Sequence, residues 1–308
     1  MSVLVLKGSL TGKLVTYVAF TFGLAYLIDL IAYYIKFNVL LFQVSASVRM
    51  YTPFAAVVII ALIHTSSVRD TLRAYGLRFR DLRVKHVITA LLIPLGMYSL
   101  GVLYAASLGY IVVNPAIPLA ISGALPTTLH PTILFIILIL KSLLAGATIN
   151  TVFAIGEEIG WRSFMQVELG KYLGTALTPL AVGIAWELWH APLILLFGYN
   201  HPHHRNLNGV LTFVLLCTIW SYILYIIRYW CGSVIAASIA HGTINGLASV
   251  SALTVIVKDE LLGMPIGFLS ILASLTILAI MLTLHYKAYK SRVSIDEVLG
   301  GGDAEKRT

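Results

Sequence analysis

Three short segments of the chain carry side chains that could do acid–base chemistry within otherwise apolar sequence. The first places Glu157 beside Glu158, with Arg162 four residues after the second glutamate. Glu158 and Arg162 therefore share a helical face, with the acid N-terminal, which is the favourable order for an ion pair. Glu157 points about 100° away and has no basic partner in its own helix. We expect the Glu158–Arg162 pair to hold a geometry and Glu157 to remain free as a general base.

The second and third segments add imidazole and amide groups. The second runs from Trp186 to His190 and includes Glu187. In the third, His241 and Asn245 lie four residues apart, so their side chains share one helical face. Both can donate hydrogen bonds to a single point, which is what a developing oxyanion needs.

The composition of the chain requires a lipid environment for these segments. Of the 308 residues, 59% are hydrophobic and only 11% are charged, and the mean hydropathy is +0.91. A soluble domain averages about 25% charged residues. The net charge of +8 fits an anionic membrane surface better than nucleic acid, so we expect no nucleic-acid partner. The sequence predicts an all-α, polytopic membrane protein whose main partner is the lipid bilayer.

Apolar stretches long enough to span a bilayer occur eight times, since a spanning helix needs about 20 mostly apolar residues. The stretch 133–169 is too long for one upright helix and is expected to tilt, bend or break around Gly146. We predict one transmembrane helical domain, 1–290, followed by a charged cytoplasmic tail, 291–308. The predicted spans fall near 14–35, 52–67, 86–112, 133–169, 178–197, 209–229, 232–252 and 264–286.

Basic residues are distributed unequally between the two sides that eight spans define. The side that holds both termini has Lys7, Lys13, Arg69, Arg73, Arg78, Arg80, Arg83, Lys85, Lys171, Arg228, Lys287, Lys290, Arg292, Lys306 and Arg307. The opposite side has Lys36, Arg49, Arg205 and Lys258. Because Lys and Arg concentrate in cytoplasmic loops, both termini are predicted to be cytoplasmic.

The depth of the polar side chains indicates one common site. The helices of the first two segments are expected to turn between Gly170 and Pro179. At 1.5 Å per residue, Glu157 lies about 20 Å before this turn and His190 about 16 Å after it. The helix of the third segment begins near Gly232, at the same surface, so His241 lies about 14 Å along that helix. Asp29 and Lys141 also fall within predicted spans, and neither is assigned a function.

Taken together, the three segments resemble the CAAX protease and bacteriocin-processing family. This family comprises intramembrane glutamate proteases and includes the type II CAAX prenyl endopeptidases. Its pattern is E-E-x-x-x-R, then usually F-x-x-x-H, then H-x-x-x-N, and the resemblance covers about residues 133–250. Trp186 stands where the family usually has Phe, so we expect a change in the shape of the substrate pocket.

The resemblance implies an activity and a role for each residue. Glu157 and His190 would activate a water for attack on a peptide carbonyl, and His241 and Asn245 would stabilise the oxyanion. The implied substrates are prenylated proteins, cut before the C-terminal tripeptide, or other membrane-anchored proteins. The implied supporting pair is Glu158 and Arg162, and we expect Trp186 and Glu187 to support the site as well.

Two alternatives follow from the same side chains. Glutamate and histidine are also zinc ligands, so the same residues could serve a zinc-dependent membrane protease. The sequence has no H-E-x-x-H, and Glu187 could either share a metal with His190 or orient it by a hydrogen bond. We favour catalysis without a metal or other cofactor. A proton-coupled transporter is the second alternative, because buried carboxylates and histidines also make proton relays.

Two further groups of residues fall outside the three segments. Cys217 and Cys231 have no metal-ligand spacing and are predicted to be reduced and structural. His201, His203 and His204 follow the fifth span, where we expect a solvated loop, with a weak transition-metal site as the alternative.

Overall fold

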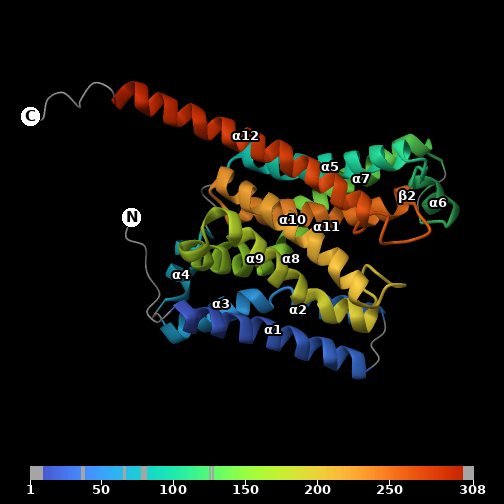
Figure 1. Cartoon of the computed structure of the whole chain (residues 1–308). Coiled ribbons are helices and arrows are strands. Elements are labelled where there is room, and N and C mark those ends of the chain that lie inside the picture. Colours follow the sequence, from blue (N-terminus) through green and yellow to red (C-terminus); the bar gives the residue numbers. More distant parts are fainter. Residues whose placement is uncertain are drawn as a thin grey trace, which may run out of the picture.

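The structure is a computed structural model that describes residues 10–35, 39–64, 67–77, 82–124, 126 and 128–300. Helices make up most of this part and run alongside one another in a bundle (Figure 1). Two short strands, β1 (Ile111–Val112) and β2 (Val255–Ile256), form an antiparallel pair. Seven stretches of the described residues are long and apolar enough to cross a membrane. The predicted all-α polytopic membrane class is confirmed.

The N-terminal region contributes one continuous and one broken candidate span. α1 (Leu10–Tyr34) is continuous. α2 (Val39–Arg49) and α3 (Thr52–His64) follow each other through a turn at residues 50–51. Together they form the second candidate span, Leu41–His64, so this span begins earlier in the chain than the predicted start at residue 52.

Arg49 is therefore not in an outer connection, and that prediction is wrong. It ends α2 inside the second candidate span, where its side chain is 1% exposed. Asp29 of α1 makes this position tolerable, because its carboxylate lies 2.9 Å from the Arg49 guanidinium. The orientation of the chain stays a prediction. The tail segment 301–308 lies outside the described residues. So do several of the basic residues from which the orientation was predicted, namely Lys7, Lys36, Arg78, Arg80, Lys306 and Arg307.

Three helices connect this region to the segments with the motifs. α4 (Val68–Ala74) is a short helix whose first turn is capped by the Ser67 side chain, which accepts a hydrogen bond from the backbone of Asp70. α5 (Val84–Ser107) is a further candidate span. α6 (Ala116–Ile121) is a single short helix before the next apolar stretch.

The stretch predicted as 133–169 is broken, as expected from its length. α7 (Pro131–Ala147) ends before Thr148, whose φ of −123° and ψ of −95° are not helical. α8 (Ile149–Glu158) then starts a new helix that ends on the two adjacent glutamates. The break lies two residues beyond the predicted position at Gly146.

The following segment continues in one direction and then reverses. A π-helical turn, η2 (Ile159–Met165), leads into α9 (Gln166–Phe197). At Gly174 the backbone is not helical, with φ of 65° and ψ of −173°, and this residue lies inside the turn predicted between Gly170 and Pro179. Glycine adopts this positive φ without the steric cost of a Cβ. The reversal divides the 49-residue apolar stretch Ile149–Phe197 into two parts, and α7 is a separate, shorter apolar helix. The predicted number of eight spans is therefore approximate.

The C-terminal third consists of three long helices. They are α10 (Leu207–Cys231), α11 (Val234–Thr254) and α12 (Phe268–Gly300). Gly232 in the left-handed conformation ends α10, and Ser233 caps α11 by accepting a hydrogen bond from a backbone N–H. α11 is the most enclosed of the candidate spans, with α5, α7, α8 and α10 packed around it (Figure 1).

Small residues let the backbone of α11 approach its neighbours closely. A Cβ added at Gly242 would lie 2.7 Å from the carbonyl oxygen of Gly146 and 2.8 Å from the backbone nitrogen of Thr151. Close backbone approach of this kind is typical of helix packing in membranes. It fixes α11, and with it His241, directly against the end of α7 and the start of α8.

Candidate active site

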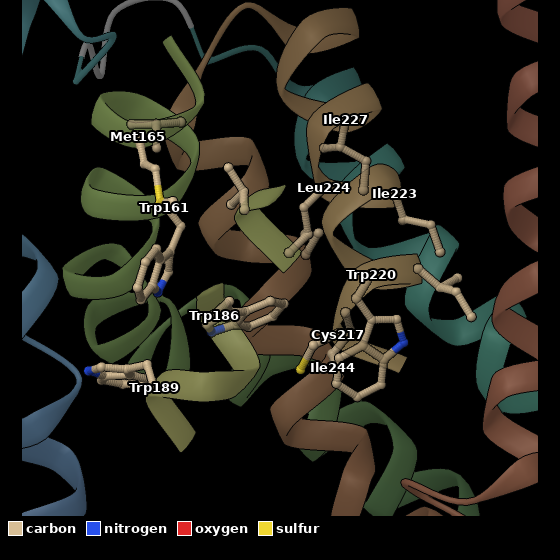
Figure 2. Packing of buried hydrophobic residues seen from close by; sticks show 14 of the residues in the cluster. Trp161, Met165, Trp186, Trp189, Cys217, Trp220, Ile223, Leu224, Ile227 and Ile244 are labelled. Carbon is tan, nitrogen blue, oxygen red and sulfur yellow. The ribbon is translucent and has the colours of Figure 1, made fainter. Parts of the chain in front are cut away.

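A cavity of about 810 Å³, including its open mouth, lies between α2, α8, α9, α10 and α11. The four residues predicted to be catalytic, Glu157, His190, His241 and Asn245, all contribute to its wall. The three motifs therefore meet at one place, as their similar depth predicted. Trp186 and Trp189 are also part of this wall, and Figure 2 shows them in the same buried cluster as Trp161.

Glu157 lies in the last turn of α8 and is almost completely buried. The indole Nε1 of Trp186 donates a hydrogen bond to its Oε2 at 2.7 Å. Phenylalanine, which the family usually has at this position, could not make this bond. The tryptophan thus affects the position of the carboxylate itself, and not only the shape of the pocket as the sequence led us to expect.

Glu158 faces the other way and joins two helices. Its Oε2 lies 3.4 Å from Nε of Arg162, which is the predicted contact, made as an ion pair without hydrogen-bond geometry. Its Oε1 is 2.9 Å from Nδ1 of His241, a partner on α11 that the spacing of the motif did not reveal. Both Glu158 and Arg162 are fully buried.

The Arg162 guanidinium is held mainly by charge and by an aromatic ring. Its Cζ lies 4.2 Å from the centre of the Trp186 ring, within the range of a cation–π interaction. None of its nitrogens has a hydrogen-bond partner among the described residues. Arg162 belongs to the π-helical turn η2, a local structure that often occurs at functional sites.

His190 is bonded to the backbone and not to the Glu187 side chain. Its Nδ1 lies 3.0 Å from the backbone carbonyl oxygen of Trp186, whereas the nearest Glu187 carboxylate oxygen is 3.8 Å away. A carbonyl oxygen only accepts hydrogen bonds, so Nδ1 carries the hydrogen and Nε2 keeps a free lone pair. A hydrogen bond between His190 and Glu187, one of the two possibilities considered for Glu187, is therefore not formed.

Glu187, His190 and Cys217 form a cluster whose side-chain donor atoms lie within 4.8 Å of one another. Both cysteines are free and buried, but Cys217 lies 3.9 Å from a Glu187 oxygen, which its spacing in the sequence did not predict. Neither Glu187 nor Cys217 is part of the cavity wall, and Nδ1 of His190 is already bonded to a carbonyl. A zinc ion held by all three residues would therefore have two ligands that are not part of the cavity wall.

Asn245 is exposed and lines a second hollow as well as the first cavity. This hollow lies between α6, α7 and α11, and its wall also includes Lys141 and Asn150. The Asn150 side chain donates a hydrogen bond to the carbonyl oxygen of Gly242 at 3.1 Å. Asn245 is thus reachable from two sides of α11.

The loop after α9 contains three histidines, and the first of them, His201, is buried and not solvated. His201 is fully buried, and burial lowers the pKa of its imidazole, so the prediction of a solvated loop is wrong there. His203 is exposed, and the Glu260 carboxylate binds the backbone N–H groups and Nδ1 atoms of both His203 and His204. Burial raises the pKa of Glu260, but these hydrogen bonds outweigh it and hold the pKa below its ordinary value.

Arg49 also contributes to the cavity wall and was missed by the sequence analysis. Its Nε donates to both carboxylate oxygens of Asp29, and its Nη2 donates to the carbonyl oxygen of Trp189. The available signal was a basic residue placed between two apolar stretches that, joined together, have the length of a span. Because the second span was predicted to start at residue 52, Arg49 was assigned to a connection outside the membrane.

The fold and this cavity define a helical membrane protein with an acid–histidine site between its helices. Comparison with known families identifies the segment more closely. Residues 134–247 match the family model described as type II CAAX prenyl endopeptidase Rce1-like. The family resemblance predicted from the motifs is confirmed for this segment, and the family is one of membrane proteases. No curated protein matches the chain.

The buried ion pair generates a prediction about stability. Glu158→Gln should lower the free energy of unfolding by about 3–5 kcal/mol, because it leaves the Arg162 charge buried without a counter-ion. Thermal and chemical unfolding of the purified protein in detergent would measure this.

Glu168→Gln is the matched control, since Glu168 is also buried but pairs with Lys171, whose side chain is 39% exposed. A glutamine there can still accept the hydrogen bond from Tyr75, so we expect a loss below about 1 kcal/mol. Equal losses for the two variants would contradict the structural role given to Glu158.

Proposed function

We propose that this protein is an intramembrane endopeptidase in which Glu157 and His190 activate a water molecule. The observation that carries the proposal is the convergence of both side chains on one cavity wall, with Nε2 of His190 free to accept a hydrogen bond. A carboxylate and an imidazole that share a water can orient it and remove its proton. The match to a membrane protease family supports the same class of reaction.

The reaction can be followed by its protons. Glu157 accepts a proton from the water while the water oxygen bonds to the scissile carbonyl carbon, and the carbonyl electrons move to its oxygen. Collapse of the tetrahedral intermediate breaks the C–N bond, and Glu157 returns the proton to the leaving amine. Trp186 holds the other Glu157 oxygen through its indole N–H, so the carboxylate keeps its orientation through both steps.

His241 and Asn245 are proposed to stabilise the oxyanion. An imidazolium at His241 would donate through Nδ1 to the Glu158 carboxylate and through Nε2 to the oxyanion. The Asn245 carboxamide supplies a second donor from the same face of α11. Fixed donors in a site of low dielectric are an effective way to stabilise such a charge.

The proposed substrates are prenylated proteins of the CAAX type, or other membrane-associated proteins, cut near the C-terminus. Aromatic and aliphatic side chains make up most of the cavity wall, among them Trp189, Phe213 and Trp220. Such a wall suits an apolar substrate segment. The site would be reached from the cytoplasmic side, where both termini are proposed to lie.

Catalysis is proposed to need no metal or other cofactor. The grouping of Glu187, His190 and Cys217 gives the zinc alternative its best support, but two of these residues lie behind the cavity wall. The transporter alternative is less well supported, because the polar residues gather around one cavity instead of following a path through the bundle.

Replacement of the proposed base tests the function directly. Purified protein and Glu157→Gln would be incubated with prenylated C-terminal peptides in liposomes, and products would be quantified by mass spectrometry. We expect kcat to fall by about 10²-fold or more, because the amide cannot accept the proton of the water. Equal product from both proteins would exclude Glu157 as the base, and no cleavage by either would exclude these substrates.

The hydrogen bond to Glu157 gives a second kinetic prediction. Trp186→Phe should lower kcat about tenfold or more with little change in KM, because a charge-assisted hydrogen bond is lost while the aromatic packing is kept. Trp230→Phe is the matched control, since its indole N–H donates to His285 and its side chain is not part of the cavity wall. If both variants lose kcat equally, or neither does, Trp186 does not position the base.

Removal of metal should leave the activity intact. We expect less than one equivalent of bound zinc in the purified protein, unchanged cleavage after treatment with a chelator, and an active Cys217→Ser variant. Elemental analysis and parallel activity assays would check all three. Loss of activity in chelator with recovery on adding zinc would establish the metal-dependent alternative.

A further inference from the structure

The guanidinium of Arg49 is fixed in place before any ligand arrives. Its Nε bonds both carboxylate oxygens of Asp29, at 2.9 and 3.0 Å, and its Nη2 bonds the carbonyl oxygen of Trp189. Its Cζ also lies 3.8 Å from the centre of the Trp189 ring. Contacts from α1 and α9 thus hold a residue of α2, and the group could bind a ligand without losing further side-chain freedom.

One nitrogen of this group has no partner. Nη1 of Arg49 is buried, and it makes no hydrogen bond with any described residue. Buried polar groups are normally hydrogen-bonded, so an orphaned pair of N–H donors calls for an explanation. Asp29 balances the charge of the guanidinium but leaves these two donors unused.

The location of Arg49 indicates where a ligand for these donors would bind. Arg49 lines the same cavity as Glu157 and His190, and it is the one Lys or Arg among the described residues of the wall. The Trp189 carbonyl that it binds belongs to the residue directly before His190. Arg49 is therefore part of the same wall as the residues proposed to cleave the bond.

An anionic group could enter this cavity only beside such a donor. The wall is largely aromatic and aliphatic, and Glu157 repels a second carboxylate at low dielectric. Cleavage near a C-terminus brings the terminal carboxylate of the substrate into the cavity with its last residues. Charge-assisted bonds between arginine and carboxylate are among the strongest hydrogen bonds in proteins.

We propose that Nη1 of Arg49 binds the C-terminal carboxylate of the substrate and so makes the enzyme select free chain ends. The proposal rests on the endopeptidase function proposed above and names the part of the substrate that the enzyme would recognise. Arg49 would act in recognition, and Asp29 and Trp189 would position it. Internal segments and amidated ends would bind less tightly, because they bring no negative charge to Nη1.

The kinetic test compares two peptides that differ only at the end of the chain. One ends in a free carboxylate and the other in an amide, and each carries the same fluorescent pair across the scissile bond. With the wild-type protein we expect KM to be at least tenfold lower for the acid. In Arg49→Lys the ratio of the two KM values should approach one, because lysine keeps the charge opposite Asp29 but lacks the second nitrogen.

Two further variants guard against effects on folding. Asp29→Asn combined with Arg49→Met removes both charges together, so no unpaired charge stays buried, and it should lose the acid preference in the same way. Arg205→Lys is the matched control, since this arginine lies exposed in the loop after α9, and it should keep the wild-type ratio. A preference for the acid that survives in the Arg49 variants would overturn the proposal.

A binding measurement separates this proposal from the function on which it rests. Calorimetry with Glu157→Gln, which should not cleave, would compare a C-terminal tripeptide acid with its amide. Tighter binding of the acid that disappears when Arg49→Lys is added supports carboxylate recognition, even if no peptide is ever cut. Equal affinity for acid and amide overturns it, even if proteolysis by the wild-type protein is established.

Discussion

A buried carboxylate without water must find its partners inside the protein, and Glu158 shows how far this requirement reaches. One of its oxygens faces Arg162 and the other binds His241. Arg162 in turn lies on the ring of Trp186, whose indole N–H holds Glu157. A single series of contacts thus links all three motifs, and the position of each polar group depends on the others.

The Asp29–Arg49 pair meets the same requirement elsewhere in the bundle. It joins α1 to α2 and, through the Trp189 carbonyl, to α9. Buried ion pairs add little net stability compared with apolar packing, but removing one partner is costly. These two pairs therefore fix the relative positions of the helices more than they add to the stability of the bundle.

The features that the sequence predicted well are local ones. Apolar runs located most spans, and the i,i+4 spacings placed Glu158 with Arg162 and His241 with Asn245 on shared faces. The partners of these residues come from distant segments, as with Glu158 and His241, which are 83 residues apart, and no periodicity encodes them. Arg49 was misplaced for a related reason, since its partner Asp29 lies on another helix.

The short length of α7 has a consequence for the membrane itself. With 17 residues it is about 26 Å long, less than the roughly 30 Å of a hydrocarbon core. A bilayer adapts to such hydrophobic mismatch by thinning or by drawing polar groups inward. α7 packs on α11 beside the hollow that Asn245 lines, so such thinning would bring headgroups and their hydration shell toward this face of the bundle.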